Sequence, residues 1–208
     1  TLSVWEVNMN GYTPQTGLVK PVKKIADFPE ARLLDGMTTL NPSEGLLLIS
    51  DTVLGLVWSL NVNTGAKYQI INIPDTQVIS GVIPALGVNG IKYKNGYLYF
   101  TTSSQGIFVR LLLNPDGSPA SNPVIVNSLF GGPDDFALDD VNNAYVAVNA
   151  DSLCLLKPDG SSMVLAGGAS STVLRGITGA KFGRTLADRE ILYMGKIGRA
   201  SCRERVYG

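Results

Sequence analysis

The sequence contains no histidine among its 208 residues and only two cysteines, Cys154 and Cys202. Without an imidazole, the chain cannot form a Ser-His-Asp triad, a His-Glu-x-x-His zinc site or a histidine general base. Any catalytic chemistry within these residues must therefore use carboxylates, amides, hydroxyls or a bound metal.

The sequence also lacks an excess of either charge and any long apolar run. Its 17 basic and 17 acidic residues balance, so it offers no basic surface of the kind that binds nucleic acid or an anionic membrane. No apolar run approaches the roughly 18 residues of a membrane span, although 45% of the residues are hydrophobic. The composition predicts a soluble globular chain of one domain, or part of one, at about 150 residues per domain, with a small molecule as its ligand.

The C-terminal segment differs from the rest of the chain. Residues Ile197 to Val206 (IGRASCRERV) look like the conceptual translation of a DNA-sequencing adapter. We therefore interpret 197–208 as a non-native tail and expect 1–196 to be a fragment, with its native N-terminus missing; the alternative is a short native basic tail. Without the tail, Cys154 is the only cysteine, so the sequence predicts a small buried hydrophobe and no internal disulfide.

The apolar pattern between Gly36 and Met194 consists of short runs, mostly five to seven residues long, separated by Gly, Asn, Asp and Pro. This spacing is typical of strands and hairpins. Dipeptide Asn95-Gly96 is a favoured hairpin turn because both positions tolerate positive φ. The runs group into units of four strands, which the sequence places at 36–73, 91–128 and 136–166, with a fourth unit beginning at 177. The sequence therefore predicts an all-β fold.

Each four-stranded unit opens with a small polar step. The steps are Asp35-Gly36, Asn89-Gly90, Asp134-Asp135 and Arg175-Gly176. Counted at Asp35, Asn89, Asp134 and Gly176, their spacings are 54, 45 and 42 residues. Such periods are typical of β-propeller blades, which have about 40–50 residues. We predict blade junctions near 35, 89, 134 and 176, with 3–27 forming the outer strands of the preceding blade, so that about four blades are present. A stacked β-sandwich is the competing architecture, but it does not explain why the small polar step recurs at the same place in each unit.

The recurring polar steps also predict a site. The first strand of each propeller blade lines the central channel, so we expect Asp35, Asn89 and Asp134 to converge at one mouth. The loops after the second strands return to the same rim and carry Asp51, Ser103 and Asn149. Carboxylate and amide oxygens suit a hard cation, calcium before magnesium. The alternative is that Asp and Asn recur here because they hydrogen-bond their own turns.

Several of these segments resemble a known family. Segments Gly87–Ile91 (GVNGI) and Pro133–Asp139 (PDDFALD) resemble the gluconolactonase and regucalcin-like (senescence-marker-like) six-bladed β-propellers, which have a TolB-like architecture. Segments Leu34–Thr38 (LDGMT) and Gly176–Arg184 (GITGAKFGR) are similar to the fungal secreted branch. The resemblance covers nearly all of Ser3–Met194 and implies a secreted protein.

The resemblance implies one divalent cation, usually calcium, at the channel mouth and hydrolysis of lactones or phosphotriesters. Matched by motif, Asn89 and Asp134 would be metal ligands, and Asp134 would also be the base for the attacking water. Asp35 would replace an asparagine that contacts substrate. The family's remaining ligand is a glutamate on an earlier blade, before this chain begins. This chain differs from the motifs of the active family members at two positions. Asp135 stands in place of a glycine, and Asp35 stands in place of an asparagine.

The sequence therefore predicts a calcium-dependent, gluconolactonase-like hydrolase of lactones or esters. Its catalytic residue would be Asp134, its metal ligands Asn89 and Asp134, and its substrate contacts Asp35, Asp51, Ser103 and Asn149. One alternative is a non-catalytic propeller that binds a small molecule or protein at the channel mouth. Another is a strictosidine-synthase-like condensing propeller, whose channel glutamate could only be Glu30, Glu44 or Glu190.

Overall fold

The computed structural model describes residues 1–13, 15, 17, 22–129, 131–149, 151–168 and 172–197. Of the predicted tail 197–208, only Ile197 lies within these residues, and its amide donates to the Gly176 carbonyl at 2.9 Å. Within the described part of the chain, no helix is long and apolar enough to cross a membrane. Apart from the 3-10 turn η1 (Pro74–Thr76), the elements are strands: β1 (Leu2–Val7), β2 (Val22–Phe28), β3 (Leu34–Asn41), β4 (Leu46–Asp51), β5 (Leu56–Asn61), β6 (Lys67–Ile71), β7 (Val88–Lys94), β8 (Tyr97–Thr102), β9 (Ile107–Leu112), β10 (Val124–Ser128), β11 (Pro133–Leu138), β12 (Ala144–Val148), β13 (Ser152–Leu156), β14 (Ser162–Gly167), β15 (Ile177–Phe182) and β16 (Leu192–Lys196).

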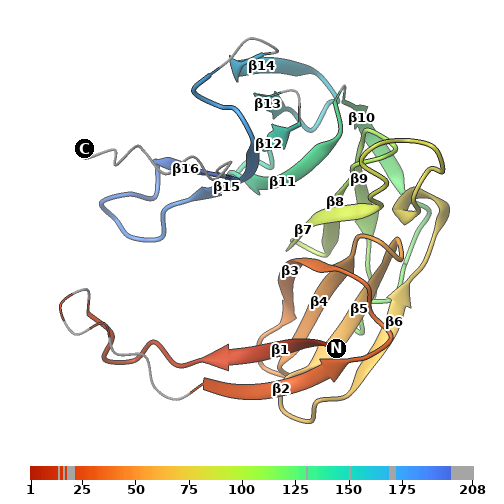
Figure 1. The fold of residues 1–208 in the computed structure, drawn as a ribbon, viewed down its shortest axis with the longest axis vertical. Coiled ribbons are helices and arrows are strands. Elements are labelled where there is room, and N and C mark those ends of the chain that lie inside the picture. Colours follow the sequence, from red (N-terminus) through yellow and green to blue (C-terminus); the bar gives the residue numbers. More distant parts are fainter. Residues whose placement is uncertain are drawn as a thin grey trace.

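The strands form three four-stranded antiparallel sheets, β3-β4-β5-β6, β7-β8-β9-β10 and β11-β12-β13-β14, and two pairs, β1-β2 and β15-β16. Figure 1 shows these sheets following one another around a curved arc. The inner strands β3, β7, β11 and β15 contact one another in that order. The predicted all-β propeller architecture is thus confirmed, and the inner strands begin at 34, 88, 133 and 177, beside the predicted junctions. A total of six blades remains a prediction.

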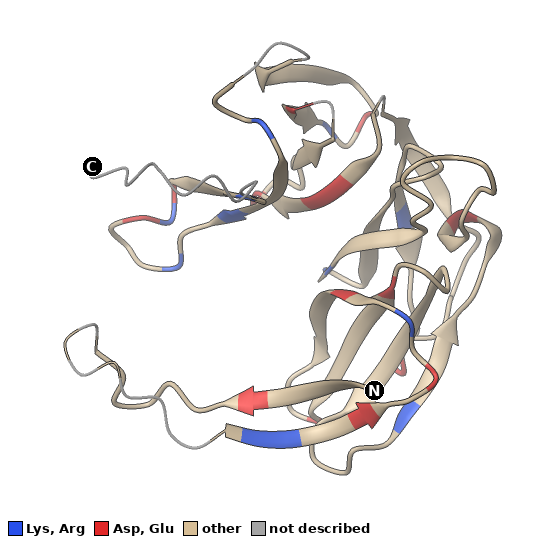
Figure 2. Cartoon of the chain, in the orientation of Figure 1, with Lys and Arg blue, Asp and Glu red and all other residues tan. Residues whose placement is uncertain are grey.

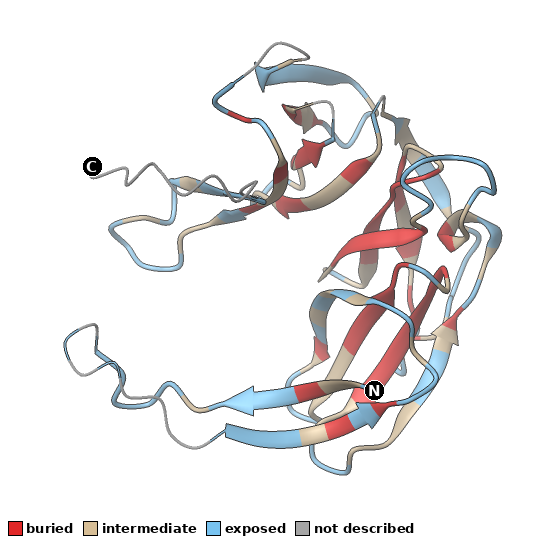
Figure 3. Ribbon diagram, viewed as in Figure 1, coloured by how far each residue is buried: buried red, intermediate tan, exposed pale blue. Residues whose placement is uncertain are grey.

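Strand β8 illustrates why the central sheets read as almost continuously apolar. Successive side chains of a strand point to opposite faces of the sheet, and both faces of this sheet are covered. Leu98 and Phe100 pack with the sheet that contains β3, whereas Tyr99 packs toward Phe136 of the sheet that contains β11. Figure 3 shows the buried residues concentrated in the middle strands of the sheets. The core therefore lies between sheets, as radial packing of blades requires.

The predicted hairpin turns have the expected backbone conformations. Asn95 and Gly96 have φ of 53° and 84°, as a two-residue turn of positive φ requires. In the Pro-Asp-Gly turns, Asp116 accepts a hydrogen bond from the Ser118 amide at 2.9 Å, and Asp159 accepts one from the Ser161 amide at 2.8 Å. The Asn95-Gly96 turn thus sets the register of the inner strand β7 against β8, whereas the two Pro-Asp-Gly turns join the outer strands of their sheets.

The inner strands approach one another closely at glycine positions. A Cβ on Gly36 of β3 would lie 2.5 Å from the Asn89 carbonyl oxygen and 2.9 Å from the Ile91 amide nitrogen of β7. A Cβ on Gly90 of β7 would lie 2.7 Å from the Asp135 Cα of β11. All of these neighbours belong to the backbone or to its Cα atoms, so none can rotate away. Glycine is therefore required for this spacing between adjacent sheets.

We expect Gly36→Ala to lower the free energy of unfolding by about 1–3 kcal/mol, because its methyl group overpacks a rigid contact. The matched control is Gly179→Ala on β15, where the nearest atom to an added Cβ is the Asp135 Cβ at 4.0 Å. Urea unfolding monitored by tryptophan fluorescence measures both variants. Equal midpoints for Gly36→Ala and the wild type would contradict the close approach of β3 and β7.

Candidate functional site

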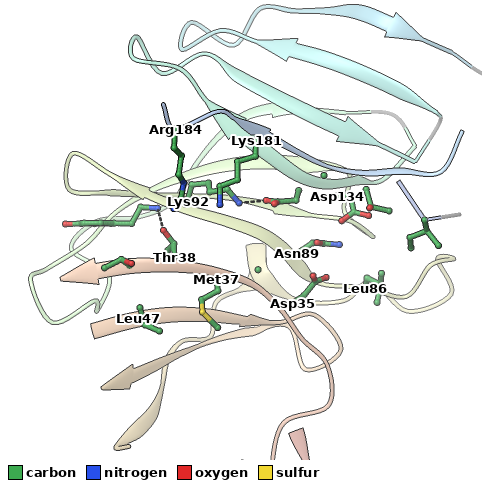
Figure 4. A pocket seen from close by; sticks show the side chains of 17 residues that line it. Asp35, Met37, Thr38, Leu47, Leu86, Asn89, Lys92, Asp134, Lys181 and Arg184 are labelled. Atoms are coloured by element: carbon green, nitrogen blue, oxygen red, sulfur yellow. Dashed lines mark hydrogen bonds and ion pairs between the residues drawn. The ribbon is translucent and has the colours of Figure 1, made fainter. Parts of the chain in front are cut away.

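The inner strands line most of an open cavity of about 930 Å³ (Figure 4). Its lining contains the three residues that the sequence predicted to converge, Asp35 from β3, Asn89 from β7 and Asp134 from β11. The structure thus brings these three side chains together, although 99 residues of sequence separate the first from the last. Leucine and methionine side chains also reach the cavity, so a polar cluster borders apolar surface.

A β-bulge places each of these side chains. In the pairing of β3 with β4, two residues, Asp35 and Gly36, oppose the single residue Ser50. The same irregularity occurs where Asn89 and Gly90 interrupt the pairing of β7 with β8, and where β11 pairs with β12. Bulges re-aim side chains and are enriched beside active sites. Sequence reasoning found the polar residues but not the bulges that direct them.

Two hydroxyl groups fasten the bulges to the neighbouring sheets. Ser50 Oγ accepts a hydrogen bond from the Gly36 amide at 2.8 Å and donates to the Asn89 carbonyl at 2.6 Å. Thr101 Oγ1 likewise accepts from the Gly90 amide at 3.0 Å and donates to the Asp134 carbonyl at 2.6 Å. Each hydroxyl ties one bulge to the next inner strand, so the spacing of the cavity residues is fixed by backbone contacts.

Asn89 is held in one orientation and retains an unused acceptor. Its side chain is 2% exposed, and Nδ2 donates to Ser103 Oγ at 3.1 Å. Ser103 Oγ in turn donates to the Pro133 carbonyl at 2.7 Å. Among the described residues, no group donates a hydrogen bond to Asn89 Oδ1. A buried acceptor without a partner is costly, which makes this oxygen a candidate contact for a ligand.

Asp134 has the most strongly altered acidity at the site. Burial, followed by the negative charges of Asp35 and Asp135, raises its pKa to about 7, against the lowering effects of the Asp135 amide and Asn89. The pKa of Asp35 is also raised, first by burial and then by Asp135, while Lys92 opposes the shift. A carboxyl group that titrates near neutral pH can either donate or accept a proton during catalysis.

The other end of the cavity is basic. Lys92 of β7 forms an ion pair of 2.5 Å with Asp135 and lies 5.2 Å from the Phe136 ring centroid. Lys181 of β15 and Arg184 just after it also line the cavity. Figure 2 shows acidic positions on β3 and β11 and a basic position on β15. Sequence reasoning missed these cations; the available signal was that Lys92 follows Asn89, and Lys181 follows the bulged Thr178, by three residues.

The three other residues predicted for the rim do not line the cavity. Asp51 is fully buried, and its carboxylate accepts hydrogen bonds from the amides of Arg32, Leu33 and Leu54 at 2.9–3.1 Å. Ser103 is buried behind Asn89 and orients it. Asn149 is exposed, and its amide donates to the Gly132 carbonyl at 3.1 Å. The structure therefore separates the two predicted sets. The side chains of Asp51 and Ser103 are used in internal hydrogen bonds, and Asn149 lies at the surface.

Two residues at the channel mouth could hold a cation. No group of three or more Cys, Asp or Glu side chains in the described ranges has a spacing that could hold a metal ion. The unpartnered Asn89 Oδ1 and the Asp134 carboxylate nevertheless provide two oxygen donors of the kind that calcium prefers. These two residues fit a hard cation, whose six to eight oxygen ligands would otherwise come from backbone, water or substrate.

The chain was compared with known proteins, and two of them have similar sequences. No family model matches the chain. It is 26% identical over 215 aligned positions to a protein of Phoma sp named "Putative hetero-Diels-Alderase", covering 93% of this chain and 60% of that protein. It is 28% identical over 200 positions to a protein of Sarocladium schorii named "Putative hetero-Diels-Alderase asR5", covering 82% and 50%. The chain thus spans between half and about three fifths of these relatives.

Solved structures show the same fold. A gluconolactonase of Xanthomonas campestris has a TM-score of 0.60 at 13% identity, covering 88% of this chain and 60% of its own. A luciferin-regenerating enzyme has a TM-score of 0.59 at 15% identity, covering 89% and 62%. The nidogen/laminin complex contains a chain with a TM-score of 0.59 at 15% identity, covering 85% and 60%. The chain therefore has a β-propeller fold that enzymes, gluconolactonase among them, share with a protein of a binding complex.

Proposed function

We propose that the cavity is an active site for a hetero-Diels–Alder cyclisation, in which Asp134 is the proton-bearing catalytic residue. The observation that carries this proposal is the Asp134 carboxyl at the cavity wall, with a pKa of about 7 caused by burial and two neighbouring carboxylates. Supporting it, two relatives that together cover most of this chain carry hetero-Diels–Alderase names. A cavity lined by both apolar and polar side chains suits an organic substrate.

The reaction class requires no redox partner and no leaving group. An oxadiene, C=C–C=O, and an alkene join through one new C–C bond and one new C–O bond. The three π bonds of the reactants are replaced by these two σ bonds and one new C=C bond, so all atoms appear in the dihydropyran product. Electron density moves toward the carbonyl oxygen as the transition state forms. A hydrogen-bond donor at that oxygen stabilises the transition state more than the ground state, which is the requirement for catalysis.

The chain's own residues can provide such a donor. Protonated Asp134 would donate to the carbonyl oxygen and keep its proton after the product forms. Asp35 and Asp135 favour the protonated form by their negative charges. Ser103 fixes the Asn89 amide beside it, so the acid lies in a preorganised polar setting while the leucine and methionine surface holds the alkene.

We expect the cyclisation rate to depend on pH with a single descending limb. The protonated form of Asp134 predominates below its pKa of about 7; above that pH the rate should fall about tenfold per pH unit. A tethered α,β-unsaturated aldehyde and alkene, followed by chiral chromatography of the dihydropyran between pH 5 and 9, measures this profile. A rate that increases with pH would contradict a proton-bearing role for Asp134.

A second candidate function is cation-assisted hydrolysis of a lactone, which the unpartnered Asn89 Oδ1 favours. A bound divalent cation would supply polarisation of the ester carbonyl and acidification of water. Asn89 and Asp134 would hold it, ionised Asp134 would accept a proton from the attacking water, and Asp35 would contact the substrate. A bound cation would lower the pKa of Asp134 below its metal-free value of about 7, so this activity should persist above pH 7, where the cyclisation falls.

The requirement for calcium and the substrate that is turned over distinguish the two candidate functions. Hydrolysis of glucono-1,5-lactone in a pH-stat should require calcium and stop with a chelator if the second candidate holds. Cyclisation should be unaffected by the chelator. Calcium-dependent thermal stabilisation without turnover of either substrate would instead support a non-catalytic propeller that binds ligands at the channel mouth.

A further inference from the structure

Two basic residues of the cavity have no acidic partner. Lys181 and Arg184 both line the cavity, and in the described part of the chain neither has a carboxylate oxygen within 4.0 Å. Lys92, in contrast, is already paired with Asp135. Figure 4 shows Lys181 and Arg184 on the side of the cavity away from Asp35 and Asn89. The cavity is therefore electrically divided into an acidic and a basic end.

The local fold directs these cations to the cavity. Ala180 and Phe182 of β15 face the interior, where Phe182 packs edge-on against Tyr145 at 5.2 Å between ring centroids. Because side chains alternate along a strand, Lys181 between them faces the opposite side. The pairing register of β15 therefore places Lys181 on the cavity side, since a shift of one residue would bury the lysine and expose Phe182.

The carboxylate of Asp188, in the loop that follows β15, hydrogen-bonds within that loop and does not pair with Arg184. Asp188 accepts hydrogen bonds from the Thr185 amide at 2.7 Å and the Thr185 hydroxyl at 2.6 Å, and from the Tyr193 hydroxyl at 3.4 Å. These contacts lower the pKa of Asp188 and engage both of its oxygens. Asp188 therefore stabilises the loop conformation, and the guanidinium of Arg184 stays available to a ligand.

Gathering cations in one cavity has an electrostatic cost. The pKa of Lys181 is lowered, first by partial burial and then by the positive charges of Arg184 and Lys92, while the Asp135 carboxylate opposes the shift. Like charges held together destabilise one another unless a counter-charge enters. An anion bound at this end would relieve the repulsion and accept hydrogen bonds from the planar guanidinium in a bidentate geometry.

We infer that Lys181 and Arg184 form an anion subsite that takes the carboxylate of an organic ligand, at the end of the cavity opposite Asp134. As a statement about the substrate, this inference rests on the proposed function: the substrate would be a carboxylic acid whose neutral part reaches Asp134. A carboxylate suits the place because its two oxygens can accept paired hydrogen bonds from the planar guanidinium, while the lysine adds a second positive charge beside it.

The test uses binding alone, so its failure is separate from failure of the proposed chemistry. Hexanoate and its neutral analogue hexanamide are titrated into the 208-residue chain at pH 7 and low salt, with amide signals observed by NMR. We expect hexanoate to shift signals of β15 and the following loop. We expect Lys181→Gln/Arg184→Gln to weaken hexanoate binding at least tenfold, because both substituted residues are exposed and the variant keeps its fold.

The control is Arg189→Gln, an exposed arginine on the same loop that lies 4.0 Å from Glu190 and does not line the cavity. It should bind hexanoate within twofold of the wild type, and hexanoate binding should weaken as salt rises. Hexanamide binding as tightly as hexanoate, or unchanged binding by the double variant, would overturn the subsite. Binding of inorganic phosphate in preference to hexanoate would overturn its assignment to a carboxylate.

Discussion

Replacing Asp134 by asparagine is expected to lower kcat/KM for the cyclisation by a factor of about 10²–10⁴, the usual contribution of a positioned acid–base group. Asparagine preserves the shape of the side chain but cannot present a carboxylic acid proton of tunable acidity. The residual rate should lose its dependence on pH near 7, because the titrating group is gone. Initial rates of dihydropyran formation between pH 5 and 9 measure both effects.

Two further substitutions make the Asp134 result specific. In Asp35→Asn, one of the negative charges that raise the pKa of Asp134 is removed, so the descending limb of the pH profile should move to lower pH with the plateau rate retained. Asp140→Asn alters an exposed carboxylate outside the cavity and should leave the profile unchanged. If Asp134→Asn retained full activity, or if Asp35→Asn moved the limb to higher pH, the proposed acid would be wrong.

The second large effect is expected on stability. Asp51→Ala should lower the free energy of unfolding by about 3–5 kcal/mol, because a fully buried carboxylate that accepts four hydrogen bonds is removed. Three backbone amides and the Trp58 indole would lose their acceptor. For a chain of this length, each kcal/mol corresponds to about 2–4 °C in Tm, so differential scanning calorimetry should show a decrease of about 6–20 °C.

Asp116→Ala is the matched control for Asp51. Asp116 also accepts hydrogen bonds from a turn, those of the Ser118 amide and hydroxyl, but it is exposed. Its loss should therefore leave Tm close to that of the wild type. The experiment also decides between two roles for Asp51: a decrease in Tm with normal catalysis supports the structural role, whereas lost activity at unchanged Tm would restore the substrate contact predicted from sequence.

The different fates of Asp51 and Asp134 show what sequence could predict. Strand positions and the phase of the polar steps could be read directly, because short apolar runs and turn dipeptides are local features. That same phase found Asp35, Asn89 and Asp134. It could not tell a rim carboxylate from one that closes its own loop, as Asp51 does, because both uses favour Asp beside a turn.

The basic end of the cavity was beyond sequence reasoning for a different reason. Lys181 and Arg184 lie 89 and 92 residues from Lys92, and isolated cations carry no motif. Only the packing of β11 against both β7 and β15 places them on one surface. The altered pKa of Asp134 could not be predicted either, since it results from burial and from carboxylates on two strands.

The bulges of the inner strands have an evolutionary consequence. At Asp35, Asn89 and Asp134 the side chain stands outside the ladder of paired residues, and neighbouring sheets hold the Asn89 and Asp134 positions through main-chain carbonyls. Neither contact depends on which side chain is present. Thr178 occupies the corresponding place in β15. Mutation can therefore exchange acid, amide or hydroxyl at each of these positions while the architecture persists, so that a single scaffold can diverge toward new reactions by changing a few residues around one ring.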